Sequence, residues 1–184
     1  MIARPKTGSR YDPAVTDPAY LAGLEQRSTD DVRAMRAECQ ALEAEVSYVR
    51  RLVQGRLDIV DAELQRRREG RPPSDLATMV ESLPDTLARH LTAPGSGRRP
   101  TTIEPVDPDP ALTAPLDLVL DAEAMGSLPD RPDEDLDEIR AGLEGIEHDL
   151  SGRRKVLFER LDALAAEITR RYRDGEASVE SLLE

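Results

Sequence analysis

Residues 35–64 read MRAECQALEAEVSYVRRLVQGRLDIVDAEL and, 104 positions later, residues 139–168 read IRAGLEGIEHDLSGRRKVLFERLDALAAEI. In the first stretch apolar residues recur at steps of 4, 3, 4, 3, 4, 4, 3 and 4, a coiled-coil pattern with one extra four-residue step. The second stretch repeats these steps, with Arg153 at one of the apolar positions. The two stretches are therefore an internal repeat in register. We call these positions the seam: Met35, Cys39, Leu42, Val46, Val49, Val53, Leu57, Val60 and Leu64, then Ile139, Leu143, Ile146, Leu150, Arg153, Leu157, Leu161, Leu164 and Ile168.

Start and stop signals flank each stretch, as expected for two long helices. Ser28 is a cap-type residue before two acids, and the pattern stops at Gly70 ahead of two prolines, so the first helix is predicted over 28–70. The second is predicted over 131–175, with a proline and three acids in its first turn and Gly175 at its end. Long helices joined by a long connector can lie antiparallel. We therefore expect an all-α fold built on a long antiparallel two-helix coiled-coil hairpin.

The rest of the chain is predicted to form short or irregular segments beside this hairpin. Six prolines lie between positions 94 and 115, so no packed structure is expected there, and 94–130 is predicted to be a disordered, acidic linker. The apolar residues 116–120 within it are either an anchoring patch or a loose helix. Short accessory helices are predicted over 71–93, either packed on the hairpin or docked on a protein partner. We also expect a flexible N-terminal arm over 1–27, with one helical turn near Tyr20, and a short C-terminal segment over 176–184.

The composition bounds the class of protein. Aromatic residues make up 3% of the chain and Trp is absent, while 34% is charged, so the core should be a narrow seam. The net charge of -12 argues against direct nucleic-acid binding, and it lies almost entirely in 101–138, where twelve acids face one base. A basic partner could be drawn to this segment, although a solvated linker also explains it. The lone Cys39 excludes an internal disulfide, and no signal peptide or membrane span is recognisable, so we expect a cytoplasmic protein without a membrane partner.

Two rows of polar residues lie one position after the seam. Four of their five positions are identical across the 104-residue offset, although neighbouring exposed positions differ, such as Ala44 and His148. One residue corresponds to about 100° around a helix, so each row forms its own band beside the seam. The first row is Glu43, Ser47, Arg50, Gln54 and Asp58; the second row is Glu147, Ser151, Arg154, Phe158 and Asp162.

The rows allow two interpretations. Acids and arginines beside a coiled-coil seam commonly form ion pairs that set helix orientation, which would make the protein a structural coiled-coil adaptor without a small ligand. Serine adds nothing to a ladder of ion pairs, however, and Arg153 at a seam position is costly unless an anion or a carboxylate is near. These two features favour a ligand-binding face.

Pseudo-two-fold symmetry places both rows of an antiparallel hairpin on one shared face. Under that symmetry Glu43 lies near the level of Asp162, and Asp58 near that of Glu147. Four arginines, at 50, 51, 153 and 154, then gather at mid-length of a site roughly 22 Å long. Guanine fits such a site, because its O6 and N7 accept from arginine and its N1 and N2 hydrogens suit a carboxylate.

The rows resemble the mark of the RsiG-type anti-sigma factors of sporulating actinobacteria, Glu-x3-Ser-x2-Arg-x3-Gln-x3-Asp on each helix of an antiparallel coiled coil. The first row matches in full, and the second departs only at Phe158, where an amide is expected and a ring could stack or pack instead. The resemblance implies that two copies of cyclic di-GMP bind across the hairpin. It also implies that the loaded protein sequesters the sporulation sigma factor WhiG.

An enzyme is the function that the sequence favours least. His90 and His148 are isolated, and no glycine-rich phosphate loop, nucleophile motif or metal-ligand spacing is present. We therefore predict a cyclic di-GMP-dependent anti-sigma factor with a WhiG-like partner, no catalytic residue and no metal; the alternative is the adaptor. The predicted ligand-binding residues are Glu43, Ser47, Arg50, Gln54, Asp58, Glu147, Ser151, Arg154 and Asp162, with Arg51, Arg153 and Phe158 as additional candidate contacts.

Overall fold

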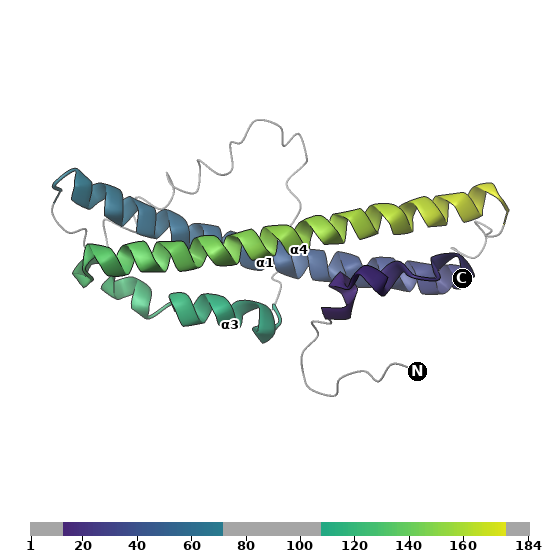
Figure 1. Cartoon of the computed structure of the whole chain (residues 1–184), viewed down its shortest axis with the longest axis horizontal. Coiled ribbons are helices and arrows are strands. Elements are labelled where there is room, and N and C mark those ends of the chain that lie inside the picture. Colours follow the sequence, from purple (N-terminus) through teal and green to yellow (C-terminus); the bar gives the residue numbers. More distant parts are fainter. Residues whose placement is uncertain (1–12, 72–107, 176–184) are drawn as a thin grey trace.

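The structure, a computed structural model, describes residues 13–71 and 108–175, and these residues form helices and turns without a strand. Two long helices dominate it, α1 (Thr29–Arg68) and α4 (Asp133–Arg173). They cross near their midpoints (Figure 1). They run antiparallel, because the end of each helix contacts the start of the other. The all-α hairpin predicted from the repeat is confirmed. No helix in the described residues is long and apolar enough to cross a membrane.

Local sequence signals fix the ends of both helices. Ser28 caps α1 through a capping box, in which its hydroxyl accepts from the Asp31 amide and the Asp31 carboxylate accepts from the Ser28 amide. The Ser28 hydroxyl also donates to the Asp31 carboxylate over 2.7 Å, and this bond, together with that from the Ser28 amide, holds the pKa of the Asp31 carboxyl below its usual range. Pro132 stands at the N-cap position of α4, one residue before the first turn in which it was predicted, and makes no side-chain capping bond; three acids follow it. Gly70 and Gly175 adopt the left-handed conformation just beyond the two C-termini, where a side chain would be strained.

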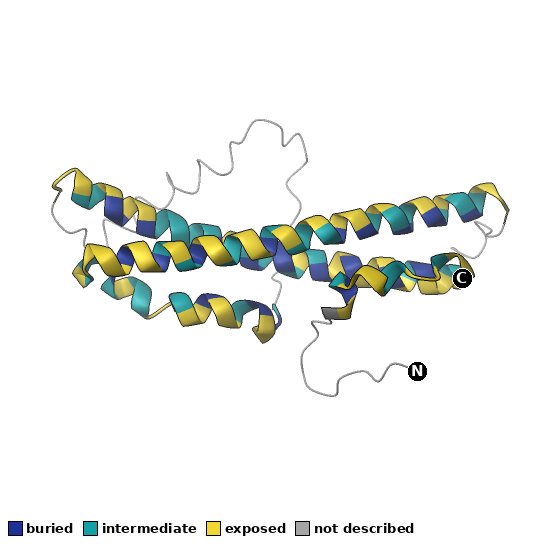
Figure 2. Cartoon of the chain, viewed as in Figure 1, coloured by how far each residue is buried: buried dark blue, intermediate teal, exposed yellow. Residues whose placement is uncertain are grey.

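The seam residues form the core between the two helices. The valines of α1 are fully buried, as are most leucines of α4, so the buried positions follow the facing sides of both helices (Figure 2). Leu57, Ile146, Leu161 and Ile168 are only partly buried but pack against this core. The core is therefore one narrow layer, as the low aromatic content predicted.

A short helix, α3 (Pro110–Val119), and the turn η4 (Ala124–Asp130) lie along one side of the hairpin (Figure 1). Leu112, Leu116 and Leu120 are at most 2% exposed and belong to the same core. We predicted a disordered linker over 94–130 without packed structure up to 115, and this is wrong for its described part, 108–130. Of the two alternatives for 116–120, the anchoring patch agrees with this burial. A helix forms because its first residue is a proline, which the first turn tolerates, and the three leucines recur at every fourth position.

The N-terminal segment covers the same side of the other half of the hairpin (Figure 1). It consists of three short turns, η1 (Pro13–Thr16), η2 (Pro18–Leu21) and η3 (Leu24–Gln26). Val15 is buried, and the Tyr20 hydroxyl donates to Glu38 of α1 over 2.8 Å. The helical turn predicted near Tyr20 is confirmed as η2, but the flexible arm predicted over 1–27 is wrong for residues 13–27, whose contacts through Val15 and Tyr20 we did not recognise. The predictions for 1–12, 72–107 and 176–184 lie outside the described residues.

Candidate functional site

The two rows converge on one side of the hairpin. Nε of Arg154 lies 3.0 Å from Oε1 of Glu43 and 2.9 Å from Oγ of Ser47, across the helix pair. The Ser47 hydroxyl in turn donates to Oε1 of Glu43 over 2.6 Å. One arginine of the second row is thus held by an acid and a hydroxyl of the first row.

The same arrangement recurs in mirror positions. Oε1 of Glu147 accepts from the Ser151 hydroxyl over 3.0 Å and from the Gln54 amide over 3.3 Å, and it lies 3.7 Å from Nε of Arg50. Acid, hydroxyl and guanidinium therefore meet twice, each time across the helix pair. We call the side that carries them the row face.

The register between the rows differs from the expected one. Gln54 lies beside Glu147, and further along the hairpin Arg140 lies 2.7 Å from Asp61. Glu147 therefore faces the fourth row position of α1, Gln54, rather than the terminal aspartate. Asp58 and Asp162 stand four residues, or about one helical turn, beyond that level.

The crossed contacts leave the outer atoms of these side chains available. Within the described residues, every hydrogen bond to Glu43 and Glu147 uses Oε1, and none reaches Oε2. No described residue accepts a hydrogen bond from Nη1 or Nη2 of Arg50 or Arg154, because their contacts are made through Nε. The side chains of these four residues are 20–38% exposed. The face thus offers two guanidinium forks and two carboxylate oxygens to a ligand.

Phe158 occupies the fourth position of the second row, where the first row has Gln54. Its ring is 40% exposed, and the guanidinium carbon of Arg154 lies 4.7 Å from the ring centroid, a cation–π contact. The ring cannot donate to Glu43 as Gln54 donates to Glu147. The two halves of the row face therefore differ at this position.

The structure does not bring Arg51 and Arg153 to the row face. Arg51 is exposed and lies two positions beyond its seam residue. Arg153 is half-buried at its seam position. Its Nη2 lies 2.7 Å from Oδ2 of Asp149, and its side chain lines a hollow beside Leu112 of α3, away from the row face. The carboxylate that the seam arginine requires is thus Asp149, and the cationic centre of the row face consists of two arginines rather than four.

We call the opposite side of the seam the covered face, because α3 and the N-terminal turns pack there. Two arginines related by the 104-residue offset hold these segments in place. Arg56 of α1 donates to the carbonyl groups of Leu116 and Leu120 and pairs with Asp117 over 3.1 Å, so it holds α3. Arg160 of α4 donates to the Asp17 carbonyl over 2.7 Å, so it holds the N-terminal turns. Each arginine stands one residue before a seam position, about 200° around the helix from the row residues.

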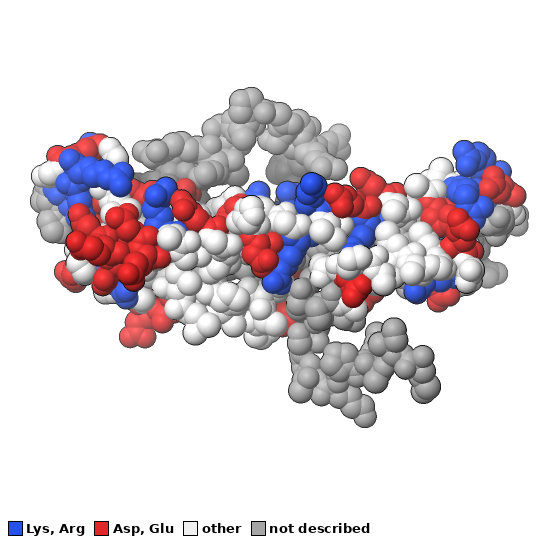
Figure 3. Space-filling view, in the orientation of Figure 1, with Lys and Arg blue, Asp and Glu red and all other residues white. Residues whose placement is uncertain are grey.

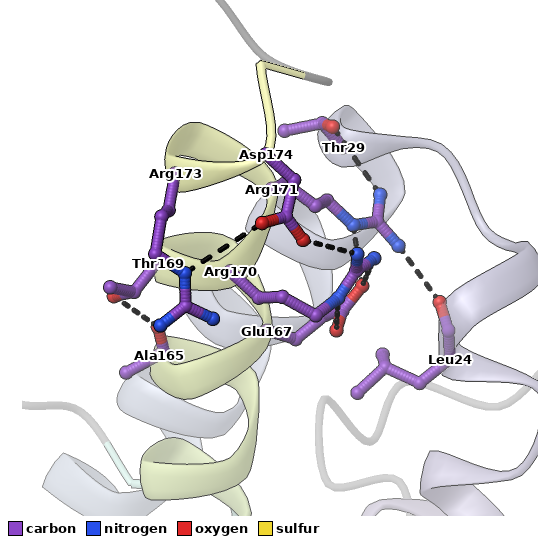
Figure 4. A network of polar contacts seen from close by, with 9 residues as sticks. All are labelled: Leu24, Thr29, Ala165, Glu167, Thr169, Arg170, Arg171, Arg173 and Asp174. Atoms are coloured by element: carbon purple, nitrogen blue, oxygen red, sulfur yellow. Dashed lines mark hydrogen bonds and ion pairs between the residues drawn. The ribbon is translucent and has the colours of Figure 1, made fainter.

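The repeat also builds an identical clamp at each end of the hairpin. In the first, Glu63 accepts from Arg66 and from Arg67, which also reaches the Leu128 carbonyl and Asp133. In the second, shown in Figure 4, Glu167 accepts from Arg170 and Arg171, and Arg171 reaches the Leu24 carbonyl and Thr29. Both acids are buried, and the arginine hydrogen bonds lower the pKa of Glu63 and bring that of Glu167 to about 2. Each acid and each arginine of the first clamp has its counterpart 104 residues later in the second clamp, and Leu24 and Leu128 are related by the same offset. This signal was present in the sequence, and we missed it.

Charge elsewhere is uneven. Figure 3 shows acidic side chains gathered over the start of α4, while uncharged side chains cover much of the region of α3. His148 is exposed on the outer side of α4. Within the described residues, no three acidic, histidine or cysteine side chains are grouped as metal ligands would be.

The comparisons with known proteins agree with the repeat. No curated protein matches the chain. A family profile described as RsiG-like matches residues 18–89 and 122–184, which include both rows, both arginines of the covered face and both clamps. Since the match extends over most of the sequence, the chain belongs to the RsiG-like family of regulatory anti-sigma factors.

Proposed function

We propose that this anti-sigma factor binds cyclic di-GMP on the row face, and that the loaded hairpin sequesters a WhiG-like sporulation sigma factor and so represses transcription in the cytoplasm. Membership of the family supports the sigma-factor partner in general. The nucleotide and the particular sigma factor rest on the motif and on the chemistry of the rows. The proposed ligand contacts are the nine residues Glu43, Ser47, Arg50, Gln54, Asp58, Glu147, Ser151, Arg154 and Asp162.

The observation that carries the proposal is the pair of crossed acid–hydroxyl–guanidinium contacts. Nε of Arg154 is hydrogen-bonded to Glu43 and Nε of Arg50 lies 3.7 Å from Glu147, so each arginine is placed beside an acid while its terminal nitrogens stay available. A guanidinium fork fits O6 and N7 of guanine or a phosphate, and Oε2 of Glu43 or Glu147 can accept from N1 and N2. Two such sets match a ligand with two guanines and two phosphates.

Control of the partner requires a difference in affinity. A ligand increases sigma-factor binding only if it binds the sigma-bound hairpin more tightly than the free one. The row face spans both long helices, so a ligand seated there fixes their relative position. We infer that this fixed position completes the surface to which the sigma factor binds.

A second candidate function, a structural coiled-coil adaptor, is favoured by one observation. The row arginines already pair with acids across the helices, as orienting ion pairs do. The adaptor requires no further ligand. The two functions differ in what nucleotides and row substitutions do to the protein.

A thermal-shift experiment separates them. We expect cyclic di-GMP at about 100 times its Kd to stabilise the protein by about 2.7 kcal/mol, or roughly 5–10 °C in Tm. GTP and cyclic di-AMP should give much smaller shifts. An unchanged Tm at saturating cyclic di-GMP, confirmed by calorimetry, would refute nucleotide binding and leave the adaptor.

A matched pair of arginine substitutions tests the site. Arg154→Gln should abolish cyclic di-GMP binding with helicity retained by circular dichroism. Arg140→Gln is the control, because Arg140 also pairs across the hairpin, with Asp61 at 2.7 Å, but lies outside the rows. Equal affinity of both variants for cyclic di-GMP would contradict the site. A titration of labelled cyclic di-GMP with and without sigma factor should show tighter binding when both are present.

A further inference from the structure

The second row departs from the repeat at one position, and that position is the most apolar point of the row face. Phe158 is the only phenylalanine of the chain and one of three large hydrophobic side chains exposed among the described residues. Burial of a phenylalanine ring is favourable, and at 40% exposure that gain is not fully realised. An exposed ring among polar row residues is therefore available for contact with a ligand.

The two halves of the row face differ around this ring. We call Arg50, Gln54, Glu147 and Ser151 the Arg50 half, and Arg154, Phe158, Glu43 and Ser47 the Arg154 half. In the Arg50 half, the Gln54 amide bonds Glu147, and Arg50 stays 3.7 Å from that acid. In the Arg154 half no amide is present, and Arg154 approaches Glu43 to 3.0 Å. The aromatic ring takes the place of the amide.

The Arg154 half brings together three groups that suit a purine. The Arg154 guanidinium lies 4.7 Å from the ring centroid, its contacts with Glu43 and Ser47 use Nε alone, and those to Glu43 use Oε1 alone, so the terminal nitrogens and Oε2 are available to a ligand. An aromatic ring can stack on the face of a base while polar groups address its edge. The Arg50 half offers the same polar groups without a stacking surface.

We propose that Phe158 is a stacking platform for a guanine base, which makes the Arg154 half the tighter of two unequal halves of the site. This inference rests on the proposed function, because it assigns a role within the cyclic di-GMP face. Base–aromatic stacking measured by alanine substitution corresponds to about a five-fold to more than a hundred-fold difference in affinity. A ring that only orders Arg154 would not contact the base.

Calorimetry with three variants of the whole chain tests the platform. Phe158→Leu keeps an apolar side chain of similar size but removes the ring, and it should weaken cyclic di-GMP binding by about 5- to 100-fold. Phe158→Tyr keeps the ring and should bind within about two-fold of the wild type. Leu52→Ala is the control, since Leu52 has a similar exposure, 37%, but lies one residue before the seam. It should not change the affinity.

Fluorescence distinguishes stacking on a base from a role of the ring in packing alone. The chain has no Trp, so Phe158→Trp introduces a single indole at the platform. Stacking with guanine should quench its emission as cyclic di-GMP is added, whereas the single indole of Leu52→Trp should keep its emission. Binding of cyclic di-GMP to Phe158→Leu with wild-type affinity, or to Phe158→Trp without quenching, overturns the platform but not the proposed function. Absence of binding to the wild type overturns both.

Discussion

The buried acid of the second end clamp provides the sharpest test of how the hairpin is held together. Glu167 is 9% exposed and accepts from Arg170 and Arg171, which lowers its pKa from the ordinary 4.5 to about 2. A difference of that size would correspond to about 3 kcal/mol for a fully desolvated carboxyl; because solvent reaches Arg170, whose side chain is 34% exposed, the stabilisation at neutral pH is about 1–2 kcal/mol. Glu167→Gln removes the charge and keeps the shape. We expect it to destabilise the protein by about 1–2 kcal/mol, or roughly 2–8 °C in Tm.

The stabilisation contributed by the Glu167 carboxylate depends on pH. A carboxyl with a lowered pKa in the folded protein takes up its proton first in the unfolded chain, so its stabilisation is complete above pH 4.5. It is lost as the pH falls from 4.5 towards about 2. The difference between wild type and Glu167→Gln should shrink across this window.

Urea denaturation followed by far-UV circular dichroism measures both quantities. Glu159→Gln is the control, because it removes the same charge from an exposed position of α4 and should change stability by less than about 0.5 kcal/mol. Glu63→Gln, in the first clamp, should resemble Glu167→Gln, since its pKa is lowered for the same reason. The reasoning is refuted if Glu167→Gln matches Glu159→Gln at neutral pH, or if its deficit is unchanged near pH 2.

Two further predictions concern the covered face and use thermal melts or urea midpoints. A Cβ on Gly142 would meet a Val119 methyl at 3.0 Å, whereas one on Gly145 meets nothing within 4 Å. Gly145→Ala should therefore stabilise α4 by up to about 1 kcal/mol, and Gly142→Ala should be less stable than Gly145→Ala by about 1–3 kcal/mol; equal melts would contradict close packing of α3. Arg160 buries Nε and Nη1 without a hydrogen-bond partner in the described residues, whereas Arg56 pairs with an acid. Arg160→Met should change stability by less than about 1 kcal/mol and Arg56→Met should cost roughly 2–3 kcal/mol; the reverse order would count against this account.

The hairpin could be predicted because its seam is a strict period. A coiled-coil spacing repeated in two stretches of one chain gives each seam a matching apolar surface, so the sides that carry Val46 and Leu150 are expected to face each other. Row positions follow from the seam, because one step along a helix is a fixed rotation. The shared face of the rows was therefore accessible from the sequence.

α3 was missed because composition was weighed above position. Six prolines between 94 and 115 indicated a loose chain. Yet Asp109 caps α3, Pro110 occupies its first turn, and Leu112 and Leu116 lie on one side of it. A proline within a helix is tolerated when neighbouring side chains bury an apolar side, and ten residues are enough to do so here.

The register between the two helices, and the side of a helix on which each arginine lies, were harder to predict than the helices themselves. The expectation that Glu43 lies near the level of Asp162 assumed a symmetry axis without knowing the level at which the helices cross, and long arginine side chains reach past a full turn. Arg153 was assigned to the ligand because a seam arginine requires an anion. Its own helix supplies one, Asp149 at four positions before it, an ordinary helical ion pair.

The repeat gives the two faces of the hairpin different roles. Arginines before the seam hold α3 and the N-terminal turns against one side, which leaves the other side for the rows. On the row face, Arg154 is hydrogen-bonded to Glu43 through Nε and Arg50 lies within ion-pair distance of Glu147, so both guanidinium groups are placed beside an acid before a ligand arrives. Ordering a long side chain costs up to about 2 kcal/mol, and here part of that cost is met by folding rather than by binding. The ion pairs between the helices are the observation that favours an adaptor. The same ion pairs would also preorganise the site for a nucleotide.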